Sequence, residues 1–190
     1  MLKKIWEQLP HPEFPGFRIL HILIAGLILS QIINSGFTST EALKQSGTSN
    51  TVIWIHIISG MGLLILGSIM LFWMLTRRGI RYYFAWLFWD FRGIKDDLLV
   101  LKGYRLPGAH EGGIASTVQG LGGLSLLAVA LSGATWFALD YLALVPTINT
   151  ERVISLHKFL TTFIEIYFFA HGAMGILHRV LNYRGITGPG

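Results

Sequence analysis

Apolar positions dominate four long stretches of the chain, at about residues 17–33, 52–75, 114–139 and 153–181. A helix needs about 20 predominantly apolar residues to cross a hydrocarbon core about 30 Å thick, and each stretch approaches or exceeds that length. The pattern therefore predicts an all-α integral membrane protein. We expect a bundle of four transmembrane helices that forms one membrane-embedded domain over residues 1–190.

The connection between the second and third stretches, at about residues 77–112, has a different character. It contains RYYFAWLFWDFRGIKDDLLVLKGYRLPG, in which a dense aromatic block is followed by alternating basic and acidic residues. Aromatic rings beside basic groups suit the headgroup layer of a membrane. We expect an interfacial helix in contact with lipid here, and a docking surface for a cytoplasmic or membrane partner is the alternative.

The positions of lysine and arginine predict the orientation of the helices. Twelve of the fifteen lie near the start of the first stretch, in the 77–112 connection, or after the last histidine of the fourth stretch. Short cytoplasmic loops carry the excess of such residues, so both termini are predicted to be cytoplasmic. The net charge of +5 is explained by this pattern. We expect a multi-pass protein of a bacterial or archaeal cytoplasmic (inner) membrane, with no nucleic-acid partner.

The composition supports a membrane protein and narrows its chemistry. Only 13% of the residues are charged, against about 25% in soluble domains. The chain has no cysteine, which excludes thiolate-bound zinc, iron–sulfur clusters and thioether-attached haem from this chain. Any redox centre must therefore be held by histidine or bound non-covalently.

Histidines are regularly spaced in the fourth stretch. The segment LHKFLTTFIEIYFFAHGAMGILH places His157, His171 and His178 at intervals of fourteen and seven residues. At about 100° per residue they lie within a sector of about 60° on a helix. Ionisable residues inside a bilayer are rare and tend to face the bundle interior. In the predicted orientation His157 lies near the outer side, and His171 lies about 21 Å deeper.

Two further histidines match these depths. His21 lies near the cytoplasmic end of the first helix and His56 near the outer end of the second. His56 can therefore face His157 at an outer level, while His21 can face His171 at an inner level. Each pair could supply the two axial nitrogens of a six-coordinate b-type haem within the bundle core. Glycines near these histidines and in the third stretch would leave room for the porphyrin.

Two other interpretations of these histidines remain. A lone histidine inside a membrane is more often a hydrogen-bonding group between helices, so a haem-free anchor or small transporter is one alternative. The agreement of four histidines in spacing, depth and topology favours haem. A bare metal site is disfavoured, because neither level has the third or fourth ligand that zinc normally takes.

These motifs resemble the di-haem membrane cytochrome b superfamily. That superfamily includes the gamma subunits of formate dehydrogenases, the cytochrome b subunits of nickel–iron hydrogenases and bacterial cytochromes of the b-561 type. FRILH resembles its first-helix ligand motif, WIHIISG its second, and LHK with AHGAMGILH its fourth. The resemblance spans nearly the whole chain. It implies two b haems held by His21, His56, His157 and His171, with quinone chemistry beside the cytoplasmic haem.

The resemblance also favours one kind of function. Free-standing b-561 proteins that oxidise superoxide usually have a short middle loop and histidines that open the third helix. This chain has a long connection, and KGYRLPGAHEGG is more similar to the dehydrogenase and hydrogenase subunits. We therefore expect a subunit that transfers electrons between a quinone pool and a dehydrogenase or reductase, through a partner's iron–sulfur or c-type cytochrome subunit. A stand-alone superoxide:quinone oxidoreductase is the alternative, and no catalytic residue for substrate oxidation is expected.

Basic residues beside two of the predicted ligands are candidates for haem propionates. Arg18 lies one turn before His21, on nearly the same face of the first helix, where it could pair with a propionate. The alternative is that it extends to a lipid phosphate. Lys158, next to His157, could hold a propionate at the outer haem.

A last group of polar residues could serve a quinone. His178, beside Arg179, has no unclaimed partner histidine within a membrane span, so it is not predicted as a haem ligand. Histidine can exchange protons near neutral pH, and His178 could therefore serve a bound quinone or simply be solvated at the interface. His110 and Glu111, before the third stretch, are further candidates for that site. Glu165 lies about 120° from the histidine face, where it could be protonated, bridge to the third helix or contact another subunit.

Overall fold

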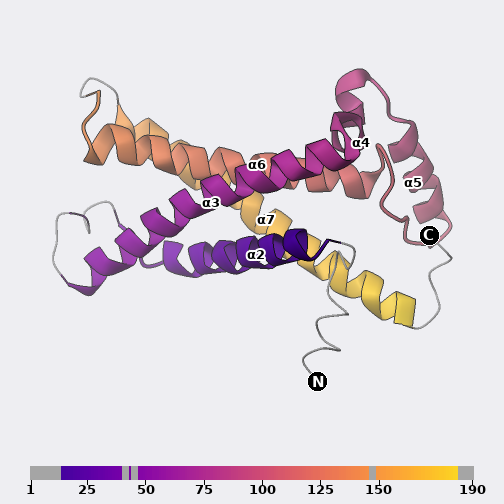
Figure 1. Ribbon diagram of the computed structural model, residues 1–190, viewed down its shortest axis with the longest axis horizontal. Helices are drawn as coiled ribbons and strands as arrows, with labels where there is room; N and C mark the ends of the chain where they lie inside the picture. Colours follow the sequence, from indigo (N-terminus) through magenta and orange to yellow (C-terminus); the bar gives the residue numbers. More distant parts are fainter. Residues whose placement is uncertain (1–13, 40–42, 44–46, 146–148, 184–190) are drawn as a thin grey trace. The chain divides into compact units, whose positions relative to one another are not determined.

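The computed structural model describes residues 14–39, 43, 47–145 and 149–183 (Figure 1). Every regular element in these ranges is helical, and four helices are long and apolar enough to cross a membrane. The prediction of an all-α protein with four spans is thus confirmed. The spans are α2 (Pro15–Ser35), α3 (Thr48–Arg78), α6 (Ile114–Trp136), which continues into a π-helical turn at Phe137–Tyr141, and α7 (Thr150–Tyr183).

The helices extend a few residues beyond the apolar stretches, and the residues at several of their ends suit a helix terminus. Pro15 occupies the first turn of α2, where its missing N–H costs nothing and its fixed φ suits a helix. Arg77 and Arg78 form the last turn of α3, where positive charge is favourable next to the exposed carbonyl groups. Gly79 follows with φ 81°, a backbone conformation that glycine adopts without steric cost.

The chain forms two compact units, one of Met1–Met70 with Leu127–Lys158 and one of Leu71–Leu126 with Phe159–Gly190. In the first unit, isoleucines of α2 and α3 are buried, and Trp54 packs edge-on against Phe137 and Tyr141 of the π-helical turn. A polar contact joins the same two helices, because the Gln31 side chain donates to the carbonyl of His56, at 3.1 Å. The single domain and the cytoplasmic location of both termini stay predictions. The residues at both ends of the chain lie outside the described ranges.

The second unit contains the folded connection. It consists of α4 (Ile80–Phe84), a 3-10 turn at Ala85–Phe88 and α5 (Arg92–Lys102). Tyr83 and Phe84 are buried beside Gly120 of α6, where an added Cβ would lie 2.9 Å from both side chains. The predicted helix is therefore present as α5, and its position against lipid stays a prediction. Large apolar side chains of the connection are exposed, among them Ile80, Leu87, Phe88, Trp89, Phe91, Leu98, Leu99 and Leu101.

Candidate functional site

The structure brings together the predicted outer pair of histidines. His56 on α3 and His157 near the start of α7 both belong to the first unit, and their ring centroids lie 6.4 Å apart with the ring planes at 89°. Both residues are half-buried. Residues 101 positions apart in the chain thus present two imidazoles to each other between membrane-spanning helices.

Helix α6 determines which ring nitrogen of His157 is protonated. Nδ1 lies 3.0 Å from the carbonyl oxygen of Val129 and 3.1 Å from the hydroxyl oxygen of Ser132. A carbonyl oxygen can only accept a hydrogen bond, so Nδ1 carries the proton and donates it. The neutral ring then has a bare lone pair on Nε2, the arrangement typical of a histidine that ligates a metal.

His56 is held through its backbone instead of its ring. Gln31 donates to its carbonyl oxygen, while the Nδ1 atom of His56 is buried without a hydrogen-bond partner among the described residues. A buried polar atom of this kind costs about 1–3 kcal/mol when nothing satisfies it. The ring of His56 therefore has an unused polar atom next to the ring of His157.

The donor chemistry of these two residues fits a haem. Two half-buried imidazoles lie against each other, and Nδ1 of His157 already has its hydrogen-bond acceptors, so this pair would supply imidazole nitrogen to a haem iron. Haem ligation by this pair stays a prediction that the donor chemistry supports.

The predicted inner pair is divided between the two units. His21 lies in the first unit, stacked on Phe17 at 6.5 Å, and His171 lies in the second, stacked on Tyr167 at 5.1 Å. The Tyr167 ring fits against α6 because position 122 is glycine, where a Cβ would overlap the ring. Their joint ligation of a haem stays a prediction.

The predicted propionate partners differ in burial. Arg18 is only 3% exposed, so its side chain packs within the first unit instead of extending away from it. Lys158 is exposed, and Glu165, half-buried on α7, belongs to the second unit. The pairing of Arg18 and Lys158 with propionates and the role of Glu165 stay predictions.

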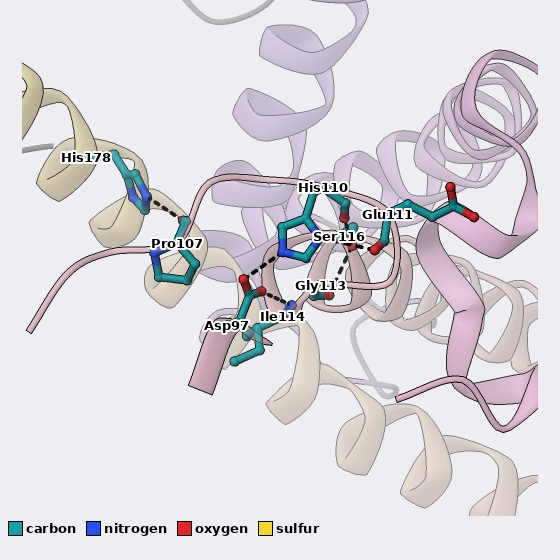
Figure 2. A network of polar contacts seen from close by, with 8 residues as sticks. All are labelled: Asp97, Pro107, His110, Glu111, Gly113, Ile114, Ser116 and His178. Carbon is teal, nitrogen blue, oxygen red and sulfur yellow. Dashed lines mark hydrogen bonds and ion pairs between the residues drawn. The ribbon is translucent and has the colours of Figure 1, made fainter. Parts of the chain in front are cut away.

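Sequence reasoning did not identify Asp97, which organises the start of α6 (Figure 2). Its carboxylate is 1% exposed and accepts hydrogen bonds from Nε2 of His110, at 2.7 Å, and from the backbone N–H of Ile114, at 2.6 Å. Ser116 donates to the carbonyl of His110, at 2.7 Å. Asp97 is one of two adjacent aspartates on α5, and only the tertiary contact distinguishes it from exposed Asp96.

The surroundings of His110 favour its protonated form. Its Nδ1 lies 3.1 Å from the carbonyl oxygen of Glu111, so acceptors face both ring nitrogens. The hydrogen bond to Asp97 raises the pKa of His110 above its usual value. In Figure 2 the Glu111 carboxylate extends away from this network.

His110 and Glu111 also line an open cleft of about 420 Å³ outside the spanning helices. Its wall is polar, and the pKa of Asp90 is lowered to about 2 by its hydrogen bonds to Arg92, so charges of both signs face the cleft. The charged lining residues are Arg81, Asp90, Arg92, Asp96 and Glu111.

His178 contacts the same loop that carries His110. Its Nε2 lies 3.4 Å from the carbonyl oxygen of Pro107 (Figure 2). Its Nδ1 lies 3.1 Å from the carbonyl oxygen of Met174. Arg179 beside it is exposed. The structure thus connects the end of α7 to the loop before α6, and the role of these residues toward quinone stays a prediction.

Comparison with known proteins identifies the family. A family model described as prokaryotic cytochrome b561 matches residues 15–187 and so includes all four spans and every predicted haem ligand. No curated protein and no solved structure matches the chain. Because the family match covers most of the sequence, this protein belongs to the prokaryotic cytochrome b561 family, and membership implies haem b binding and a membrane electron-transfer role.

Proposed function

We propose that this cytochrome carries two b haems and transfers electrons between a quinone pool and a partner dehydrogenase or reductase of a bacterial or archaeal cytoplasmic membrane. The observation that carries the proposal is the convergence of His56 and His157, with Nδ1 of His157 occupied by α6. Haem b supplies reversible one-electron transfer at its iron, and the protein supplies position and surroundings.

Two pairs of histidines would hold the two haems. His56 and His157 would hold the outer haem, and His21 and His171 the inner one. The apolar spans that carry these histidines would exclude water from the haems. Arg18, which is buried near His21, would offset the charge of a propionate, and Lys158 would do so at the outer level.

The quinone would bind at the cytoplasmic end of the second unit. His178 and the loop with His110 and Glu111 lie together there, and Arg179 adds a positive charge. Quinone reduction takes up protons as well as electrons, and His178 is the candidate to pass a proton at its ring nitrogen. An iron–sulfur or c-type cytochrome subunit of a larger complex would exchange electrons at the other end, since this chain has no cysteine for such centres.

The haem content of the detergent-purified chain tests this proposal. We expect two b haems per chain by pyridine haemochrome assay, and one after either His157→Ala or His171→Ala. His110→Asn is the matched control and should keep both haems, because protein groups already occupy both nitrogens of His110. Folded protein without haem, produced with haem available, would refute the function. Retention of both haems in His157→Ala would refute the outer ligand assignment.

A further inference from the structure

The imidazole of His157 lies against a position of α6 that has no side chain. A Cβ added at Gly133 would lie 2.9 Å from Cε1 and 3.2 Å from Nδ1 of His157. Because carbon atoms in a packed interior avoid contacts this short, any larger residue at this position would displace the ring. The ring therefore occupies space that only glycine leaves open.

The same turn of α6 supplies the acceptors for the ring. Val129, Ser132 and Gly133 are related by three and four positions, so they share one face of the helix. The hydroxyl of Ser132 donates to the Val129 carbonyl, at 2.8 Å. Its oxygen remains available to the N–H at Nδ1 of His157, at 3.1 Å. Ser132 is 8% exposed, so solvent does not replace this contact.

We infer that Ser132 and Gly133 are positioning residues for His157, which together set the place and the tautomer of its imidazole. This inference rests on the proposed ligation of haem by His157. Gly133 lets the ring approach α6 closely enough for Nδ1 to reach the two oxygen atoms. Nε2, across the ring from those acceptors, is then held ready as the metal-facing nitrogen. A histidine without this support could rotate or present the wrong nitrogen.

A substitution at Gly133 distinguishes a positioning role toward His157 from a contribution to folding. Glycine inside a helix is less stable than alanine by about 1 kcal/mol, so Gly133→Ala should favour α6 itself. The same substitution places a methyl group against His157. Its effect on the helix and its effect on the histidine are therefore of opposite sign, which a purely structural role would not produce.

The test compares Gly133→Ala with Gly123→Ala in the full chain. Gly123 lies on the same helix, and its added Cβ would meet only the end of the Leu71 side chain, at 3.4 Å. Circular dichroism checks the fold, the haemochrome assay gives haem content, and electron paramagnetic resonance and redox titration report each ferric haem. We expect Gly133→Ala to shift the resonance and midpoint potential of one haem, or to lose that haem. Gly123→Ala should match the wild type.

Ser132→Ala provides a second variant that adds no volume. It removes one acceptor from Nδ1 of His157 and should shift the same haem signal by less, with both haems retained. Wild-type resonances and potentials in both Gly133→Ala and Ser132→Ala would overturn the inference. A parallel His157→Ala variant separates the two levels of the argument. If His157→Ala loses one haem while Gly133→Ala and Ser132→Ala both match the wild type, the positioning role fails. If His157→Ala keeps both haems, the proposed ligation fails.

Discussion

Helix α6 contacts a histidine near each end, and the two contacts differ in charge. At its start, the buried carboxylate of Asp97 binds the ring of His110, and further along, the neutral Val129 carbonyl and Ser132 hydroxyl bind the ring of His157. In both places a glycine lies against the ring, since a Cβ at Gly113 would approach His110 to 2.9 Å. The geometry is similar, but only the first contact includes a carboxylate.

The difference between the acceptors of the two histidines follows from their surroundings. It decides which of the two imidazoles can bind a metal. His110 precedes the span and is exposed to water, where an ion pair can be solvated, whereas a charged ring within a span is costly. His110 has acceptors at both nitrogens, so neither nitrogen is left to face a metal. His157 has an acceptor at one nitrogen only among the described residues. The hydrogen-bond partners thus make His157, and not His110, a candidate metal ligand.

The largest effect is expected when the contact between residue 132 and His157 is made ionic. Ser132→Asp would place a carboxylate inside a span, at a cost of about 3 kcal/mol, and would favour a charged His157. We expect loss of one haem and a lower yield of folded protein, measured by haemochrome assay and gel filtration. Ser132→Asn is the neutral control and should keep more haem. Equal haem content in the two variants would contradict the importance of charge at this position.

Removal of the charged contact at the start of α6 should have the next largest effect. Asp97→Ala deprives His110 and the Ile114 N–H of their buried acceptor, and we expect a loss of about 2–3 kcal/mol in the free energy of unfolding. The exposed neighbour provides the control, since Asp96→Ala should change stability by less than about 0.5 kcal/mol. Unfolding in mixed detergent micelles, followed by circular dichroism, measures both. Similar losses in the two variants would show that burial of Asp97 is not what matters.

Haem content should be unchanged in Asp97→Ala if the two contacts are independent. Asp97 lies in the second unit and His157 in the first, and no described contact joins them. We therefore expect two haems per chain with unshifted potentials in the variant that remains folded. A selective change at one haem would show that the start of α6 is coupled to a haem site.

Features that depend on a local pattern of residues, such as the spans, could be predicted from the sequence. Hydropathy marked four spans, and the matching depths of His56 and His157, each near the start of its helix, were enough to predict that they could meet. Asp97, Ser132 and Gly133 escaped notice because their roles come from contacts between helices. Ser132 and Gly133 lie among many small residues in LSLLAVALSGATW, and nothing in that segment marks which of them faces a histidine. Gln31 is likewise one polar residue in a largely apolar run, and only its contact with the His56 carbonyl shows its role.

The smallest expected effect is the pH dependence of the His110 contact. The pKa of His110 is raised from its usual 6.5, so its contribution to stability is complete below that value and is lost as pH rises through the raised pKa. The effect should be modest, because the His110 side chain is 45% exposed and water screens its charge. We expect the wild type to lose more stability than His110→Gln between about pH 6 and about pH 9, as measured by thermal unfolding. Parallel curves for the two proteins would mean that the ring is held by its neutral hydrogen bonds alone, and the contrast in charge between the two ends of α6 would then disappear.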